Sequence, residues 1–219
     1  MPVSKTKKKI ILAAVELFNE SGIHSVRNQD IAKKSGISLS NFNYHYATKK
    51  DLVKAIFDYM TEVLVEDVYG NQTFIIEGEG LNITKSFFVF QEQFCFFFLD
   101  TPNILKFYPE ISKLLEEQIT EAFKMIKGVN YLAIGMGYMK PEPEDFPGLY
   151  DELAAHLWRN THFWISYSRI KNFKDNIVLK GMEANYSLMY PYLTEKGIEA
   201  NQRFLEKLKE ETSADREEP

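Results

Sequence analysis

Residues 28–52 read NQDIAKKSGISLSNFNYHYATKKDL, and the interpretation of the whole chain starts from this stretch. Ile31 and Ala32 form the apolar side of a short helix, Gly36 follows four residues after Ala32, and Phe42 is the one strongly apolar position in the next segment. Two short helices that cross at a small residue and turn at a glycine have this spacing. The pattern predicts a helix-turn-helix, with helices over residues 27–35 and 38–45.

The polar residues of the second helix favour nucleic-acid binding over an ordinary helical hairpin. An alanine and a glycine four residues apart occur in many hairpins, so the spacing alone leaves both readings open. Hydroxyl, amide, phenol and imidazole groups can contact base edges and phosphates. These groups belong to Ser38, Ser40, Asn41, Asn43, Tyr44 and His45. Lys49 and Lys50 open the following helix, where we expect them to meet backbone phosphates.

The N-terminal region resembles the DNA-binding head of the TetR/AcrR-type transcriptional regulators. The resemblance covers residues 5–57 and is carried by AAVELFNESG, DIAKKSGIS, NYHY and TKKDL. The first of these motifs belongs to a helix over residues 5–20, in which Ile10, Ala14, Leu17 and Phe18 recur at helical spacing. That helix is expected to brace the other two.

The resemblance implies an all-α, TetR-like fold with two parts. Residues 1–48 would form the helix-turn-helix head, residues 49–211 a helical domain for ligand binding and dimerisation, and residues 212–219 a disordered tail. It also implies a homodimeric, ligand-responsive repressor whose recognition helices lie in the major groove of a palindromic operator. The DNA contacts it implies are Asn28, Gln29, Leu39, Ser40, Asn41, Asn43, Tyr44 and His45. Ser38 and Lys49 join the expected DNA-binding set because hydroxyl and ammonium groups can contact phosphates.

Two departures from the family pattern support an alternative function. Val26 and Arg27 stand where the family usually has Thr or Ser, and Asn43 stands where it usually has Tyr. The alternative is a helical ligand-binding or interaction module whose helix-turn-helix no longer reads a specific DNA sequence.

The charge of the chain is divided unevenly between its two parts. The formal net charge is −5, which taken alone argues against nucleic acid. Residues 1–52 carry nine Lys and Arg against four Asp and Glu, a net charge of +5, whereas residues 53–219 carry −10. A basic head on an acidic body is typical of a DNA-binding module joined to a domain with another task.

The remaining composition indicates a cytoplasmic protein. The chain has 219 residues and one cysteine, Cys95, so a disulfide framework or a multi-cysteine metal site is excluded. A lone cysteine also suits a reducing compartment. No uninterrupted apolar run approaches ~20 residues, so a membrane span is not expected.

The aromatic stretch over residues 81–100 predicts a buried helix. It contains seven phenylalanines, and a helix that is apolar nearly all round belongs in a core. The same residues could line a cavity for a small apolar or aromatic effector, and pure core packing is the alternative for each of them. The residues expected at such a cavity are Phe87, Phe90, Phe94, Phe97, Tyr131 and Trp164.

Two long helices near the C-terminus, over residues 149–172 and 175–193, are candidates for a dimer interface. Apolar residues recur in the second at steps of three and four, which suits packing against another helix. A seam inside one chain has the same pattern, so this alternative stays open. The expected interface residues are Leu153, Leu157, Trp164, Leu179, Met182, Tyr186, Met189 and Leu193.

The sequence gives no sign of an enzyme. It lacks a Ser/His/Asp pattern, a P-loop and a glycine-rich dinucleotide fingerprint. Glu152 and His156 share a helical face, but His162 lies off that face, so we expect no metal site and no cofactor.

Overall fold

The computed structural model describes residues 4–70 and 79–214. Within these ranges the chain is helical and contains no strand, which confirms the all-α prediction. The elements are α1 (Lys5–Ser21), α2 (Asn28–Lys34), α3 (Leu39–His45), α4 (Lys49–Val63), a π-helical segment (Leu64–Tyr69), α5 (Glu79–Gln93), α6 (Cys95–Phe107), α7 (Pro109–Gly135), α8 (Leu149–Ile170), α9 (Ile177–Met189), a 3₁₀ turn (Tyr190–Tyr192) and α10 (Glu195–Ala214). None of these helices is long and apolar enough to cross a membrane.

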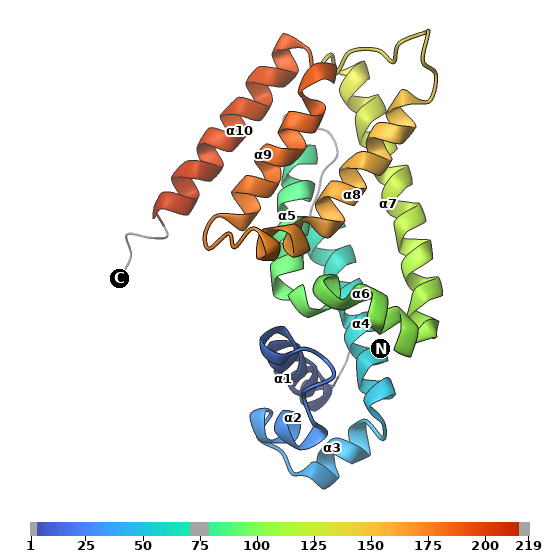
Figure 1. Ribbon diagram of the computed structural model, residues 1–219, viewed down its shortest axis with the longest axis vertical. Coiled ribbons are helices and arrows are strands. Elements are labelled where there is room, and N and C mark those ends of the chain that lie inside the picture. Colours follow the sequence, from blue (N-terminus) through green and yellow to red (C-terminus); the bar gives the residue numbers. More distant parts are fainter. Residues whose placement is uncertain (1–3, 71–78, 215–219) are drawn as a thin grey trace.

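Helices α1, α2 and α3 form a head at one end of the molecule, and α4 runs from it into the body (Figure 1). Local hydrogen bonds start α3 and α4: Ser38 Oγ accepts from the amide of Asn41 at 3.2 Å, and Thr48 exchanges side-chain and backbone bonds with Asp51. Gly36 makes the predicted turn with a φ of +66°, in the left-handed region that glycine favours. The helix-turn-helix prediction is confirmed.

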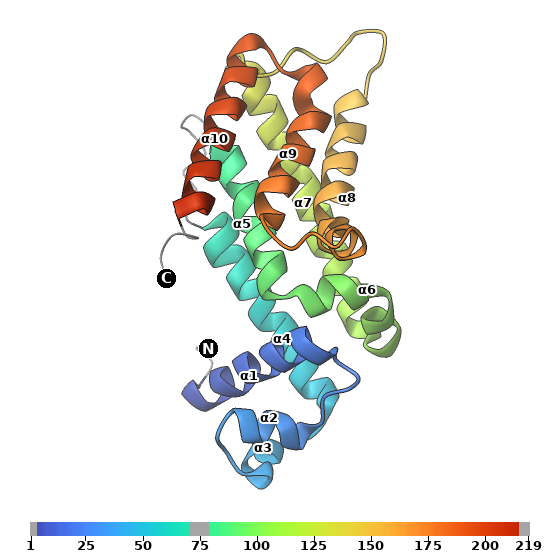
Figure 2. The same cartoon turned by 60° about the vertical axis from the view of Figure 1, so that its left-hand side comes forward.

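The body consists of α5 to α10 packed around the upper part of α4 (Figures 1 and 2). α8 packs on α7, α9 packs on both α5 and α8, and α10 covers an outer side of α9. An added Cβ at Gly181 of α9 would stand 2.7 Å from the ring of Phe88 on α5, so only glycine permits this close approach. The connection between α7 and α8 lies at the opposite end of the molecule from the head.

The aromatic stretch over residues 81–100 forms parts of two helices and not one. The helix breaks at Phe94, where φ is −117° and ψ is 37°, and α6 then bends at Asp100. This geometry buries Phe94, Phe96, Phe97 and Phe98 together, which one straight helix could not do on a single face. Pro102 is tolerated because it lies in the first turn after the bend, where its missing N–H is not needed.

The sequence predicts a helix from residue 110 to about residue 127, but α7 extends to Gly135, eight residues further. Pro109 occupies its first turn, as prolines often do. Thr212, Ser213 and Ala214, from the segment predicted as a tail, belong to α10. Residues 215–219 of that segment lie outside the described residues, as do residues 71–78, where glycines at 70, 78 and 80 predict a loop.

A single apolar cluster joins the head to the body. It contains Phe18 of α1, Phe57 of α4 and Phe96 of α6, and the rings of Phe18 and Phe96 meet edge to face at 5.4 Å. A division of the chain at residue 48 remains a prediction, because no gap in the apolar packing marks it.

Candidate nucleic-acid interface and internal cavity

The outer side of α3 presents an almost continuous polar surface. Its only buried residue is Phe42, which is fully covered, while Tyr44 is 85% exposed. His45 is partly exposed and its ring meets that of Tyr44 edge to face. The other predicted contact residues of this region are exposed, namely Ser38, Leu39, Ser40, Asn41 and Asn43. The structure therefore places this predicted set on one accessible surface.

The start of α2 lies in the neighbouring position expected for a second contact. Gln29 is exposed and Asn28 is partly exposed. The amide of Arg27 donates to Asp30 Oδ2 at 3.1 Å, which closes the first turn of α2 and leaves the Asn28 and Gln29 side chains available.

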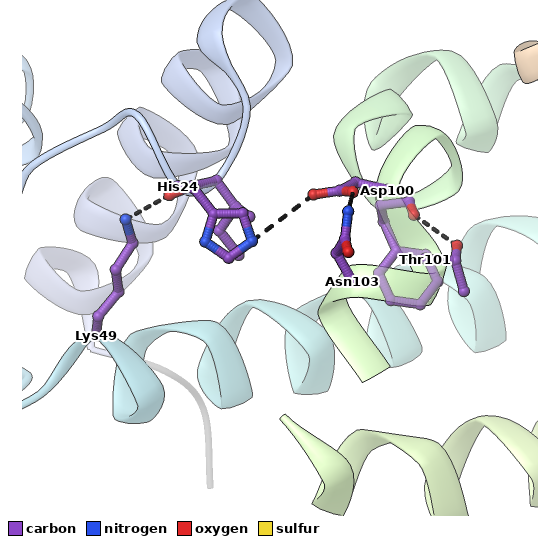
Figure 3. Close-up of polar contacts among 7 residues, drawn as sticks. His24, Lys49, Asp100, Thr101 and Asn103 are labelled. Atoms are coloured by element: carbon purple, nitrogen blue, oxygen red, sulfur yellow. Dashed lines mark hydrogen bonds and ion pairs between the residues drawn. The ribbon is translucent and has the colours of Figure 1, made fainter. Parts of the chain in front are cut away.

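Lys49 does not belong to this surface. Its ammonium group donates to the carbonyl oxygens of Ile23 and Val26, the latter at 2.7 Å, in the loop between α1 and α2. Figure 3 shows the first of these bonds, from Lys49 to the backbone beside His24. Burial lowers the pKa of the Lys49 amine. The predicted phosphate contact is replaced by a structural role, because the ammonium group already binds two backbone oxygens inside the head.

Tyr46, from the NYHY motif, also points inward. Its ring packs near Phe42, its hydroxyl has no hydrogen-bond partner within the described part of the chain, and burial raises its pKa to about 12. Tyr46 therefore supports α3 from below and does not reach outward with Tyr44.

A cavity lies in the body between α4, α5, α6, α7 and α8. Its volume, including an open mouth, is about 480 Å³. It is lined by Phe57, Met60, Thr61, Leu64, Phe87, Phe90, Phe97, Phe98, Leu115, Gln118, Ile119, Ala122, Trp158 and His162.

Three of the six residues expected at a cavity line this one: Phe87, Phe90 and Phe97. Phe94 is fully buried but packs behind them against Phe90 and Tyr59. Tyr131 is half exposed on α7, beyond the cavity.

Trp164, the sixth, belongs to a separate cluster, where its indole N–H donates to the Ile177 carbonyl at 2.8 Å. The aromatic stretch could not reveal the lining residues from α4, α7 and α8, because they come from distant parts of the sequence. In α8, Trp158 lies six positions before Trp164 and therefore on another face of the helix, and this spacing is the sequence signal that marks the cavity side.

Polar contacts of Asn19, His24 and Lys50 join the head and the start of α4 to α5, α6 and the start of α7. Asn19 of α1 binds both ends of the break between α5 and α6: its amide nitrogen donates to the Gln93 carbonyl at 2.8 Å, and its oxygen accepts from the Phe96 amide at 3.0 Å. His24 lies 3.9 Å from Asp100 (Figure 3), and Lys50 lies 3.3 Å from Glu110. α6 thus contacts the head on one side and lines the cavity on the other.

Most of the residues expected at a dimer interface pack inside this chain. Leu179, Met182 and Trp164 form a core cluster with Phe88, and Leu153 and Leu193 form another; these five side chains are buried. Leu157, Tyr186 and Met189 are partly buried against the same clusters. The heptad-like spacing therefore describes an intramolecular seam, which was the open alternative.

The apolar face that α8 leaves exposed is a different one. Phe163 is 52% exposed, Tyr167 46% and Ile170 83%, and their spacing of four and three places them on one side of the helix. We call these three residues the α8 stripe.

The residues considered for a metal do not converge. Glu152 and His156 face solvent, whereas His162 is buried and faces the cavity. No group of three or more His, Cys, Asp or Glu able to hold a metal ion occurs in the described ranges.

Comparison with known proteins matches both parts of the chain to one family. A sequence profile described as "Bacterial regulatory proteins, tetR family" matches residues 10–56, and one described as "Bacterial transcriptional repressor" matches residues 79–200. The biofilm operon icaADBC HTH-type negative transcriptional regulator IcaR of Staphylococcus aureus is 27% identical over 128 residues. That match covers 57% of this chain and 63% of the relative, so the chain spans less than two thirds of the relative's length.

Solved structures share the fold over nearly the whole chain. A TetR-family transcriptional regulator from Marinobacter aquaeolei VT8 superposes with a TM-score of 0.79 at 24% identity, covering 93% of this chain and 98% of that one. A transcriptional regulator from Saccharomonospora viridis, solved in complex with choline, gives a TM-score of 0.67 at 16% identity, with 88% and 100% covered.

Proposed function

The chain belongs to the TetR family of bacterial transcriptional regulators, and we propose that it is a repressor that binds a palindromic operator as a homodimer and releases it when a small molecule occupies the cavity. The exposed polar face of α3 is the observation that carries the proposal. Repression is further supported by the IcaR relative, which is named as a negative regulator. A ligand-responsive body is supported by the S. viridis neighbour, which was solved with choline.

Base reading in this proposal belongs to the middle of α3. Asn41 and Asn43 each offer an amide that can pair bidentately with adenine, and Leu39 can pack on a thymine methyl group. Tyr44 and His45, at the end of the helix, are assigned to phosphates. The net charge of +5 on residues 1–52 draws this surface toward DNA.

The dimer in this proposal forms through the α8 stripe. Three large apolar side chains side by side on a solvent-exposed helix are costly without a partner. A two-fold axis would bring the stripes of two chains together, because a symmetric dimer uses the same surface on both subunits. Two heads related by this axis would then read the two halves of a palindrome.

Coupling between ligand and DNA is assigned to α6. Phe97 and Phe98 of α6 line the cavity, and the break just before them is held by Asn19 of the head. A ligand that displaces these rings would shift the start of α6 and, through Asn19, the head. The ligand changes DNA affinity only as far as it prefers one of the two arrangements.

The test is selection of random duplex DNA by the purified protein, followed by affinity measurements with Asn41→Ala. The proposal expects an inverted repeat, and a loss of roughly 1–3 kcal/mol confined to one base-pair step in each half-site for the variant. Asn201→Ala, at a partly exposed asparagine on α10, is the control and leaves the affinity unchanged. Salt-sensitive binding without a motif, or an equal loss on operator and random DNA, contradicts the proposal.

A further inference from the structure

The lining of the cavity carries no charge. None of the fourteen residues that form it is Asp, Glu, Lys or Arg, and most are aromatic or aliphatic. A carboxylate or ammonium group placed here would lose its water without gaining a counter-ion, which is strongly unfavourable. The cavity therefore selects against charged molecules.

Two of the polar lining residues already bond to each other. Gln118 Nε2 donates to Thr61 Oγ1 at 2.8 Å, and the Thr61 hydroxyl donates to the Phe57 carbonyl at 3.0 Å. The first bond connects α7 to α4, and the second uses the hydroxyl hydrogen of Thr61, which therefore cannot be donated to a ligand.

His162 is different, because its hydrogen-bonding capacity is unused. The residue is 5% exposed, and in the described ranges neither of its ring nitrogens has a hydrogen-bond partner. Its ring stacks on Trp158 at 4.5 Å and meets Phe98 edge to face at 5.2 Å. Burial lowers the pKa of His162 to about 4, so the imidazole is neutral near pH 7 and offers one donor and one acceptor.

The position of this imidazole is fixed before any ligand arrives. Gln91 of α5 donates from Nε2 to the carbonyls of Thr161 and His162, at 2.7 and 2.9 Å. These bonds hold α8 against α5 at the level of the ring. Neither ring nitrogen of His162 belongs to the fully enclosed side-chain atoms that lack a partner in the described ranges, so the imidazole opens into the cavity, where a ligand can pair with it.

We propose that the cavity binds an uncharged aromatic molecule carrying one hydroxyl or similarly small hydrogen-bonding group, which pairs with His162. The aromatic part lies among the rings of Phe87, Phe90, Phe97 and Phe98, and the polar group points to the imidazole. The inference rests on the proposed function only in taking this molecule as the regulatory signal. Its binding is measured without DNA.

In the experiment, the full-length protein is titrated at pH 7 with 1-naphthol, naphthalene or 1-naphthoate, and calorimetry measures the dissociation constant of each probe. These probes share one ring system and differ in the group presented to His162. We expect 1-naphthol to bind about three- to tenfold more tightly than naphthalene, as for one net hydrogen bond, and 1-naphthoate at least about a hundredfold more weakly than 1-naphthol. Equal or tighter binding of 1-naphthoate, or no binding of 1-naphthol, overturns the proposal.

Two variants locate the hydrogen bond. His162→Phe keeps the stacking on Trp158 and is expected to bind naphthalene but to lose the preference for 1-naphthol. Gln118→Leu is expected to keep the preference for 1-naphthol over naphthalene. If the Gln118→Leu protein loses this preference and the His162→Phe protein keeps it, the assignment of the hydrogen bond to His162 is overturned.

A measurement on the unmodified protein covers the case in which His162→Phe does not fold. Imidazole ¹⁵N NMR identifies His162 as the histidine that stays neutral to the lowest pH. Adding 1-naphthol should shift its two ring-nitrogen signals, whereas adding naphthalene should leave the tautomer of the His162 ring unchanged. An unshifted imidazole overturns the proposal. If no probe binds but the protein still binds an operator, only this inference is overturned. If 1-naphthol binds tightly but DNA selection yields no operator, only the proposed function is overturned.

Discussion

The ammonium group of Lys49 lies between the carbonyls of Ile23 and Val26, so its loss should be felt in the fold and not at the DNA. Lys49→Met retains the aliphatic stem near the ring of Phe18 but leaves two carbonyls without their donor. We expect the free energy of unfolding to fall by roughly 1–3 kcal/mol, measured by urea denaturation. The salt dependence of DNA binding should keep its slope.

The matched control for this prediction is Lys54→Met. Lys54 pairs with Asp58 on the exposed side of α4, and such pairs contribute at most about 0.5 kcal/mol. A Lys49→Met protein as stable as the wild type, with a salt slope smaller by about one, would restore the phosphate contact first expected from the sequence.

His162 should make the stability of the protein depend on pH in a defined window. Its pKa falls from the ordinary 6.5 to about 4 in the folded chain, so between these values the unfolded chain binds more protons. Stability is therefore highest above about pH 6.5, decreases as the pH is lowered toward 4, and loses roughly 2–3 kcal/mol by pH 4.5.

The comparison that isolates this effect is His162→Phe, unfolded by urea at pH 7 and pH 4.5. The variant should lack the roughly 2–3 kcal/mol contribution of His162, because the substitution removes this imidazole and leaves the rest of the chain unchanged. Parallel stability curves for the two proteins would mean that His162 is not held neutral by burial.

For single residues, the sequence predicted which side chains of a short helix are exposed, but it did not predict where a long side chain such as that of Lys49 points. Asn41, Asn43 and Tyr44 are exposed on α3 as expected, since the polar face of a short helix is set by its own periodicity. The direction of Lys49 could not be predicted in this way. The carbonyls that Lys49 binds belong to Ile23, 26 positions earlier in the chain, and to Val26, 23 positions earlier. The spacing of residues within the motif does not indicate contacts over such separations.

The break between α5 and α6 is the element on which the head depends most directly. Asn19 satisfies one carbonyl and one amide that the break leaves without helical partners. Asn19→Ala should expose the Phe96 amide and raise its hydrogen-exchange rate about tenfold, as expected for the loss of one hydrogen bond.

Asn103→Ala serves as the comparison, because Asn103 lies on the same helix beyond the bend at Asp100. It should leave the exchange of the Phe96 amide unchanged. If Asn19→Ala also leaves it unchanged, the contact does not hold the start of α6, and the proposed route from the cavity to the head loses its link.

At the scale of elements, helix existence was predictable and helix interruption was not. The phenylalanine run indicated burial, but a break at Phe94 depends on tertiary partners that include Asn19, 75 residues earlier in sequence, with the Phe94 ring packed on Tyr59 of α4. The apolar seam on α9 was predictable, because its apolar residues recur at steps of three and four. Period alone cannot tell a partner helix in the same chain from one in another, and the structure assigns Leu179 and Met182 to the chain's own core.

For the whole molecule, the α8 stripe leads to a prediction about assembly. Phe163→Glu places a charge within the α8 stripe and should raise the dimer dissociation constant at least about tenfold, because an aromatic residue buried at an interface commonly contributes about 2 kcal/mol or more. Sedimentation velocity over a range of protein concentrations measures the change.

Phe146→Glu is the control for this experiment. Phe146 is 56% exposed, close to the value for Phe163, but lies before the start of α8, about 20 Å from the stripe along the helix axis. The two substitutions add the same charge at the same type of residue. Equal weakening by both would place the interface elsewhere.

The apolar cluster that runs from α1 into α6 decides how this protein can be recombined with its relatives. A chimaera joined after residue 48 would carry the recognition surface but separate Phe18 from Phe96 and Asn19 from the helix ends it binds. The smallest portable unit is discontinuous: it comprises the head, α4, the last turn of α5 with Gln93, and α6, and it omits the rest of α5. Grafts onto a foreign body should therefore transfer operator choice intact only when the recipient's α6 is replaced together with its head.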